Sequence, residues 1–215
     1  MRKETAKERT DGRVTRQALI DAAGILAARR GWSSVCAKDV CELAGMSTAS
    51  VNYWFGGRTQ LYREVVGQIS EGIFDTDLEA FLQSNAEPLE KIRKVLEAFL
   101  MASRDRSRWR LALWAREMFT GPSEEFLRMK RTNGIRHMNF VRQTIADYLG
   151  MSGHGAQIEV VVMSILAPCM LMVASSPEFV KESYPSLLGY KGKEAAVEQL
   201  LEMLRSLKQA RESRR

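Results

Sequence analysis

Residues 36–55 read CAKDVCELAGMSTASVNYWF, a pattern of two short helices joined by a tight turn. The first helix covers about residues 37–44 and ends at Gly45, because glycine adopts a positive φ without a steric penalty from Cβ. Ser47 is a favourable N-cap for a second helix over about residues 48–54. A small Cys41, the glycine and an inward-facing Val51 have the spacing of a helix-turn-helix, in which the two helices cross closely. This segment therefore predicts a helix-turn-helix motif.

The second helix of this motif has an outward face that can recognise a nucleic acid. If Val51 and Phe55 point into the protein, that face presents a hydroxyl, a small apolar group, an amide and a phenol, from Thr48, Ala49, Asn52 and Tyr53. Such groups read base edges in the major groove or hold the phosphate backbone. Another interpretation stays open: the same spacing arises by chance in helical hairpins, and residues 53–55 would then be core aromatics.

Positive charge is concentrated around the motif. Lys38 lies on the first helix and Arg58 follows the second, so both are placed to meet phosphate. Residues 1–60 hold ten Lys and Arg against six Asp and Glu. Residues 1–13 are charged and poor in apolar groups, which predicts a flexible basic arm. This distribution is consistent with a polyanionic partner.

The rest of the sequence follows the 3.6-residue period of amphipathic helices, which indicates an all-α fold. We expect helices at about residues 15–30, 59–84, 88–104, 107–119, 123–149, 155–175 and 193–211. Gly31 ends the first of them. Gly24 weakens that helix by about 1 kcal/mol relative to alanine, so the helix needs tertiary packing. After the arm, we expect a three-helix helix-turn-helix domain at residues 14–60 and a larger helical domain at residues 61–215.

Composition excludes several classes of protein. The chain has 215 residues, of which 45% are hydrophobic and 27% charged, with a formal net charge of +6, so neither full disorder nor a disulfide scaffold fits. The three cysteines are odd in number and follow a charged N-terminus, which predicts reduced thiols in the cytoplasm. The longest uncharged apolar run, residues 160–176, is shorter than the ~20 residues of a membrane helix. We expect a cytoplasmic protein with no membrane partner.

Residues 15–62 closely resemble the N-terminal domain of the tetracycline-repressor (TetR) family of bacterial transcriptional regulators. The matching segments are LIDAA at 19–23, GW at 31–32, DV at 39–40, AGMS at 44–47, YWFGG at 53–57, Arg58, and LY at 61–62. The resemblance implies DNA contacts from Lys38, Thr48, Ala49, Ser50, Asn52, Tyr53, Trp54 and Arg58. Several positions depart from the family pattern: Gly24 and Ala27 replace bulkier core residues, and Cys36 and Cys41 stand where Thr or Ser and Ala are common. Asn52 replaces a more common tyrosine, and Arg58 replaces the usual lysine but keeps its charge.

The C-terminal part resembles the family only in general terms, as a helical domain that dimerises and often encloses a small-molecule pocket. A single helix-turn-helix makes too few base contacts, so regulators present two of them about one DNA turn, ~34 Å, apart. We therefore expect a homodimer through the helices at 155–175 and 193–211. Their apolar residues could also pack within one chain; they are Ile158, Val161, Val162, Ile165, Leu166, Cys169, Met172, Ala196, Val197, Leu200, Leu201 and Leu204.

A ligand pocket is expected among aromatic, methionine and arginine side chains, since methionine suits adaptable sites. The candidate residues are Trp109, Arg110, Trp114, Met118 and Met163. Each of the apolar residues, taken alone, fits a plain core position better than a pocket wall, and Arg110 equally fits a surface ion pair. His137 and His154 lack partners at metal-ligand spacing, and no nucleophile motif or phosphate loop is present. We therefore expect no catalytic residue, no metal and no cofactor.

These features together predict a sequence-specific DNA-binding regulator that is not an enzyme. Its expected partners are double-stranded operator DNA, a second copy of the chain and an unidentified small-molecule effector. Effector binding would release a repressor from its operator, since a ligand acts only through differential affinity for two states. Two alternatives are a helical adaptor of the same fold that has lost DNA binding and, with less support, a helical enzyme.

Overall fold

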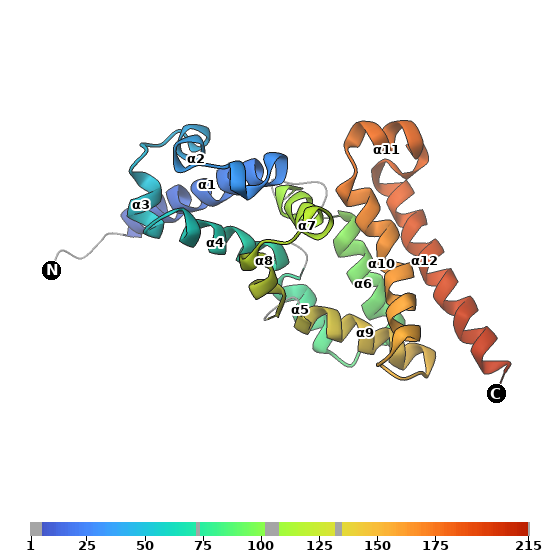
Figure 1. The fold of residues 1–215 in the computed structure, drawn as a ribbon. Helices are drawn as coiled ribbons and strands as arrows, with labels where there is room; N and C mark the ends of the chain where they lie inside the picture. The colour runs from blue at the N-terminus through green and yellow to red at the C-terminus, as the bar shows by residue number, and fades with distance from the viewer. Residues whose placement is uncertain (1–5, 72–73, 102–107, 132–134, 215) are drawn as a thin grey trace. The chain divides into compact units, whose positions relative to one another are not determined.

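The computed structural model describes residues 6–71, 74–101, 108–131 and 135–214, and every regular element in these ranges is a helix (Figure 1). The predicted all-α class is therefore confirmed. The helices divide between two compact units, which we describe separately. Unit 1 comprises residues 1–69 and 109–129, and unit 2 comprises residues 70–108 and 130–215.

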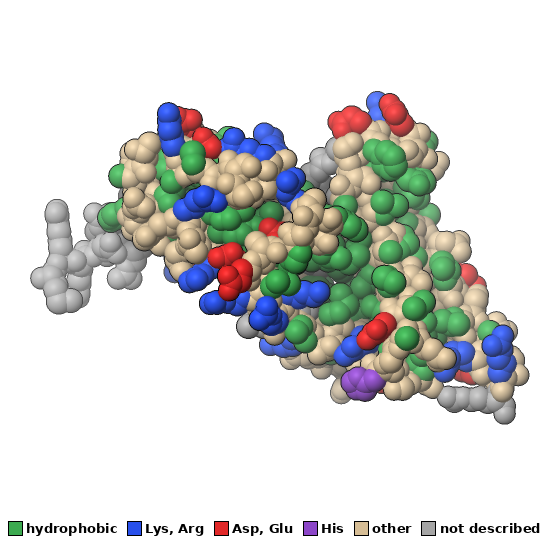
Figure 2. Space-filling model, viewed as in Figure 1, with side chains coloured by type: hydrophobic (Ala, Val, Ile, Leu, Met, Phe, Trp, Pro, Cys, Tyr) green, Lys and Arg blue, Asp and Glu red, His purple; other side chains and the backbone are tan. Residues whose placement is uncertain are grey.

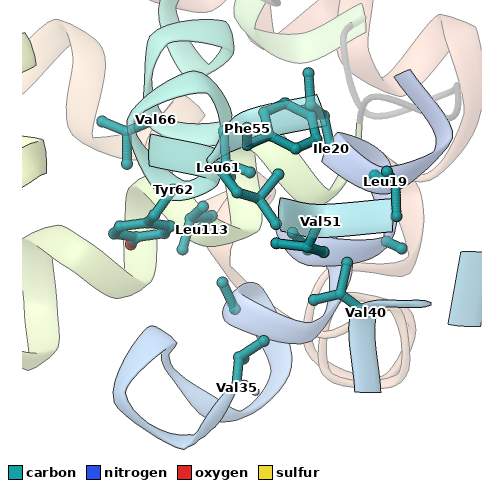
Figure 3. Packing of buried hydrophobic residues seen from close by; sticks show 14 of the residues in the cluster. Leu19, Ile20, Val35, Val40, Val51, Phe55, Leu61, Tyr62, Val66 and Leu113 are labelled. Atoms are coloured by element: carbon teal, nitrogen blue, oxygen red, sulfur yellow. The ribbon is translucent and has the colours of Figure 1, made fainter. Parts of the chain in front are cut away.

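Unit 1 encloses a core to which α1, α2, α3, α4, α7 and α8 contribute. Figure 3 shows buried side chains that converge from α1, α2, α3, α4 and α7, among them Val40, Val51 and Leu113. Because α7 lies far along the chain, this core is not built by the N-terminal residues alone. The elements of unit 1 are α1 (Ala6–Arg30), η1 (Trp32–Ser34), α2 (Ala37–Ala44), α3 (Ser50–Phe55), α4 (Arg58–Glu71), α7 (Arg108–Thr120) and α8 (Glu124–Met129).

The compact units do not divide the chain at residue 60, where the sequence predicts a domain boundary. Leu61, Tyr62 and Val65 on α4 are fully buried in the core of unit 1, so the core continues beyond that residue. Trp109 and Leu113 on α7 belong to the same cluster. Whether residues 14–60 and 61–215 act as separate functional domains stays a prediction.

Residues 6–13 form the first turns of α1, where the sequence predicts a flexible arm. Gly12 explains how this part of α1 packs: a Cβ at this position would lie 3.1 Å from Cη2 of Trp54. The missing side chain lets the tryptophan lie close against the helix. Residues 1–5 of the predicted arm lie outside the described residues.

Gly24 lies where α1 and α7 meet, and its role is steric. A Cβ at this position would fall well inside the contact distance of the Trp109 ring. Trp109 has little room to move, because it is 5% exposed and its Nε1 donates to Oδ1 of Asp21 at 3.2 Å. The tertiary packing that the sequence predicts for the weak helix position is therefore confirmed.

A Gly24→Ala variant should be less stable than the wild type by about 1–3 kcal/mol, because overpacking against Trp109 outweighs the gain in helix propensity. Gly67→Ala on α4 is the matched control. No atom lies within 4 Å of its Cβ position, so this variant should be more stable by about 0.5–1 kcal/mol. Urea unfolding of both variants measures the difference, and shifts of the same sign would contradict the steric role of Gly24.

Unit 2 is organised around α6, which packs against α9, α10 and α12 (Figure 1). Its core contains mainly aliphatic side chains, including Leu96, Ile145, Ile158 and Leu201, all of them fully buried. The elements of unit 2 are α5 (Thr76–Gln83), α6 (Pro88–Met101), α9 (Ile135–Leu149), α10 (Ala156–Ala174), α11 (Pro177–Ser183), η4 (Pro185–Leu187) and α12 (Gly189–Glu212).

Two helix predictions need correction. The helix predicted at 59–84 is two, because Asp75 caps α5 by accepting a hydrogen bond from the Leu78 amide at 2.8 Å. Within the helix predicted at 123–149, α8 and α9 lie on either side of residues 132–134, which are outside the described ranges. The predicted break at 177–192 contains α11, since Ser176 caps its N-terminus and proline suits the first helical position. Side-chain N-caps therefore begin two helices whose starts the apolar periodicity does not record.

Candidate functional site

The turn between α2 and α3 has the geometry that its sequence predicts. Gly45 lies in the left-handed region at φ 68° and ψ 33°, and the Met46 amide donates to the Cys41 carbonyl at 2.8 Å. No atom lies near its Cβ position, so it is the backbone conformation that requires glycine. Cys41 and Val51 are fully buried where the two helices cross. The predicted helix-turn-helix is confirmed in these residues.

The start of α3 differs from the prediction. Ser47 is not its N-cap, because residues 47–50 form a turn in which the Ser50 amide donates to the Ser47 carbonyl at 3.0 Å. The two serine hydroxyls lie 3.1 Å apart. The helix therefore begins at Ser50, with Ala49 as N-cap. Thr48 and Ala49 are exposed in the turn that leads into α3.

The outward face of α3 is polar, whereas its inward face is buried. Asn52 and Tyr53 are exposed, Tyr53 to 80%, while Val51 and Phe55 lie in the core of unit 1. Trp54 is half-buried and packs on that core, with its ring edge-on to Tyr53 at 5.1 Å. The resemblance implies DNA contacts from Asn52, Tyr53 and Trp54 of α3. Asn52 and Tyr53 are exposed to solvent, whereas Trp54 also packs α3 against the core.

Lys38 and Arg58, the two cations that flank α3 in the sequence, differ in how strongly they bind their partners. Lys38 is 71% exposed and lies 3.7 Å from Glu42 one turn along α2, a contact weak enough to exchange for phosphate. Arg58 is held more firmly. Its Nη2 donates to the Trp32 carbonyl at 2.6 Å, and its guanidinium lies 4.7 Å above the Trp32 ring. Arg58 therefore also anchors the start of α4 to η1.

A buried polar contact continues inward from Arg58. The Trp32 ring stacks on Tyr62 at 4.2 Å, and the Tyr62 hydroxyl donates to Glu117 of α7. Glu117 also accepts from the Ser123 amide at 2.6 Å. Burial, with the bond to Glu117, raises the pKa of Tyr62 above its ordinary value, so the phenol stays a neutral donor. No sequence pattern points to Glu117, since its partner is 55 residues away.

Four of the predicted ligand residues belong to unit 1 and the fifth, Met163, belongs to unit 2. Arg110 donates to Gln68 of α4 at 3.0 Å, Trp109 fills the space at Gly24, and Trp114 packs on the core of unit 1. Met118 is exposed on α7, and Met163 is exposed on α10 of unit 2. As a ligand set these five residues stay a prediction, and the first three have structural roles within unit 1.

The described residues of unit 2 enclose cavities of ligand size, and none of the five predicted residues lines the two described next. One, of about 330 Å³, lies between α5 and α9 and is lined by Glu79, Leu82, Gln83, Arg136, His137 and Phe140. The other, of about 460 Å³, lies among α10, α11, η4 and α12, with an apolar lining that includes Leu171, Met172 and Met203. Both volumes fall within the range of small-molecule sites.

The residues that the sequence proposes for the dimer interface are mostly buried in unit 2. Ile158, Ile165 and Leu166 on α10 and Val197 and Leu201 on α12 belong to its core. Another apolar surface is left exposed, and Figure 2 shows hydrophobic side chains along α10 on the visible face. We call this surface the α10–α12 stripe; it consists of Val160, Met163, Ala167, Leu171, Met203 and Leu207.

The described residues also bear on whether the chain holds a metal site, a membrane-spanning helix or a disulfide. Among them, no three His, Cys, Asp or Glu side chains gather as metal ligands. Within the same ranges, no helix combines the length and apolar character that crossing a bilayer requires. Cys36 is exposed, and Cys41 and Cys169 are buried, all three as free thiols.

Comparison with known proteins identifies the C-terminal region. Residues 88–207, more than half of the chain, match the family described as "HTH-type transcriptional dual regulator CecR, C-terminal domain". No curated protein sequence matches the chain.

Solved structures share the fold. A TetR-family transcriptional regulator from Bordetella parapertussis 12822 is 15% identical, with 88% of this chain and 93% of that chain covered and a TM-score of 0.68. AibR, solved in complex with isovaleryl coenzyme A and operator DNA, is 16% identical over 88% and 97% of the two chains, at TM-score 0.65. HlyIIR, a hemolysin II transcriptional regulator, is 18% identical over 89% and 97%, at TM-score 0.62. With its helix-turn-helix and the match of residues 88–207, the chain belongs to the TetR-type transcriptional regulators, in the family of the CecR C-terminal domain.

Proposed function

We propose that this regulator is a homodimeric repressor that binds operator DNA through α3 and is released by a small-molecule effector bound in unit 2. The observation that carries the DNA-binding part is the two-sided character of α3. Val51 and Phe55 fix the helix in the core, while Asn52 and Tyr53 stand in solvent. The proposed role needs no catalysis, and it would be performed in the cytoplasm, where an operator is accessible.

The proposed DNA contacts have distinct roles. Asn52 carries an amide suited to adenine, and Thr48 and Ala49 supply a hydroxyl and a methyl group at the entrance to the helix. Tyr53 and Lys38 are placed for phosphate oxygens, which fix the position of the protein on the duplex. Ser50, Trp54 and Arg58 would act at the edge of the surface, because each already contacts another part of unit 1.

The α10–α12 stripe is the proposed dimer surface. Its members on α10 recur at spacings of three and four residues, so they form one helix face. Three of them, Val160, Met163 and Leu171, are each more than half exposed. An apolar face of this extent on a soluble protein marks an interaction surface, and a specific operator requires two reading heads.

The effector part of the proposal is supported by the two cavities of unit 2. The structure of AibR with isovaleryl coenzyme A and operator DNA indicates that a protein of this fold can hold both kinds of ligand. An effector that binds more tightly to the DNA-free state weakens operator binding by the reciprocal factor.

The test is an electrophoretic mobility shift with the DNA upstream of the regulator's own gene, repeated over a range of salt. If six or more phosphates are contacted, affinity should fall roughly 10³-fold between about 50 and 200 mM salt, because bound counterions are released. A salt-independent complex would contradict phosphate contact. Failure to bind this DNA, or any member of a random duplex library, would favour the adaptor alternative.

A further inference from the structure

A carboxylate of α5 forms hydrogen bonds to two neighbouring side chains of α9, an arginine and a histidine. Oε1 of Glu79 accepts hydrogen bonds from Nη2 of Arg136 at 2.9 Å and from Nε2 of His137. Arg136 and His137 are neighbours at the start of α9, and both donate to the same oxygen. This arrangement recognises a carboxylate by charge and by two convergent donors.

His137 is fixed more rigidly than Arg136. Its ring stacks on Phe74 at 4.3 Å with the planes 7° apart, and its side chain is 13% exposed. Its Nδ1 is buried and has no hydrogen-bond partner among the described residues. Arg136 is 66% exposed and touches Glu79 through one nitrogen, so a second oxygen can reach its other donors. The pair thus combines a preorganised imidazole with an adaptable guanidinium.

An empty space of about 330 Å³ adjoins this carboxylate contact. Leu82 and Phe140 give it an apolar wall, and Gln83 lies at its edge. Both α5 and α9 pack on α6. Glu79, which lines the cavity, joins α5 to α9 through its hydrogen bonds to Arg136 and His137. A ligand with a carboxylate and a short apolar body would match the charge at one end and the wall at the other.

The geometry points to Arg136 and His137 as the binding site for a small organic carboxylate that displaces Glu79 and so releases α5 from α9. This inference names the effector class in the proposed function and rests on that function for its regulatory role. Glu79 can leave without crossing the core, because its side chain is 30% exposed. The hydrogen bond from His137, followed by the charge of Arg136, lowers the pKa of Glu79, so at neutral pH it is a charged internal competitor.

The test titrates the full-length protein with hexanoate and follows the imidazole proton resonances of the histidines. The chain has two histidines, so a His154→Gln variant assigns both signals. Hexanoate should shift the His137 resonances and leave those of the exposed His154 unchanged. Hexanamide, which has the same apolar body without the charge, should shift neither.

Two variants make the test specific. Arg136→Gln should weaken hexanoate binding about tenfold or more, because a charge-assisted pair is lost. Glu79→Gln should tighten binding by about the same factor, since the competing carboxylate loses its charge. If Glu79 served only to hold α5 against α9, Glu79→Gln would instead weaken hexanoate binding. An equal response to hexanamide, unchanged affinity in Arg136→Gln, or weaker binding in Glu79→Gln would overturn the inference.

A mobility shift with hexanoate keeps this inference separate from the proposed function. Release of DNA from the wild type, but not from Arg136→Gln, would support both the site and its regulatory role. Shifted His137 resonances without release would support the site and contradict effector control through it. If no DNA complex forms at all, the proposed function fails, and the resonance titration still decides the carboxylate site.

Discussion

A Tyr53→Ala variant should fold like the wild type and bind operator DNA roughly 10- to 100-fold more weakly for each reading head. Tyr53 is 80% exposed, and its ring touches only the edge of Trp54, so little folding free energy depends on it. Its loss removes a contact from both heads of a dimer at once. Fluorescence anisotropy with a labelled operator measures the affinity, and urea unfolding checks that stability is unchanged.

Phe119→Ala is the matched control for this variant. Phe119 also belongs to unit 1 and is 70% exposed, but it lies at the end of α7 outside the helix-turn-helix. Truncating it should leave operator affinity within about twofold of the wild type, as expected of a surface change away from the contact. Equal losses in the two variants would show that exposed aromatics act non-specifically, and an unchanged Tyr53→Ala affinity would contradict the assignment of α3.

A Met163→Glu variant should be monomeric and should lose high-affinity operator binding. Met163 is 65% exposed within one chain, so a carboxylate there is harmless to the isolated fold. In the proposed dimer it would be buried without a partner, at a cost of about 3–5 kcal/mol for each copy. The dimer dissociation constant should therefore rise at least roughly 10³-fold. Sedimentation velocity measures the oligomeric state, and anisotropy measures the accompanying loss of DNA affinity.

Met138→Glu provides the comparison for the dimer variant. Met138 is 38% exposed in the same unit, but it lies on α9 and not on the α10–α12 stripe. The same substitution should leave this protein dimeric and able to bind DNA. Dimers in both variants would place the interface elsewhere, whereas monomers in both would indicate general sensitivity of unit 2 to added charge.

Helix boundaries followed from sequence where local chemistry was unambiguous. Gly31 ends α1 at a positive φ of 82°, and Gly45 does the same for α2. The prediction failed at Asp75, where a side-chain cap starts a new helix within an otherwise continuous apolar pattern, and at Ser176, where a cap starts a helix in a stretch predicted as a break. Caps act over three residues, so their outcome depends on a local competition that apolar periodicity does not record.

The candidate site was partly accessible from the sequence. The exposed face of α3 could be inferred because Val51 and Phe55 are one helical turn apart and share a side. Trp54 was harder, because its half-buried position depends on Gly12, from a helix more than 40 residues earlier in the chain. The Arg136–His137 site was missed, since its carboxylate partner lies 57 and 58 residues away on α5.

The sequence by itself determined the helix-turn-helix, because a glycine turn and a one-turn spacing of buried residues act within some twenty neighbouring positions. Tertiary structure alone decided the roles of Trp109 and Arg110, which bond to residues 88 and 42 positions away. It also decided which side of α10 faces solvent. That helix is apolar nearly all round, so only packing against α6 and α9 could bury Ile165 and leave Met163 exposed.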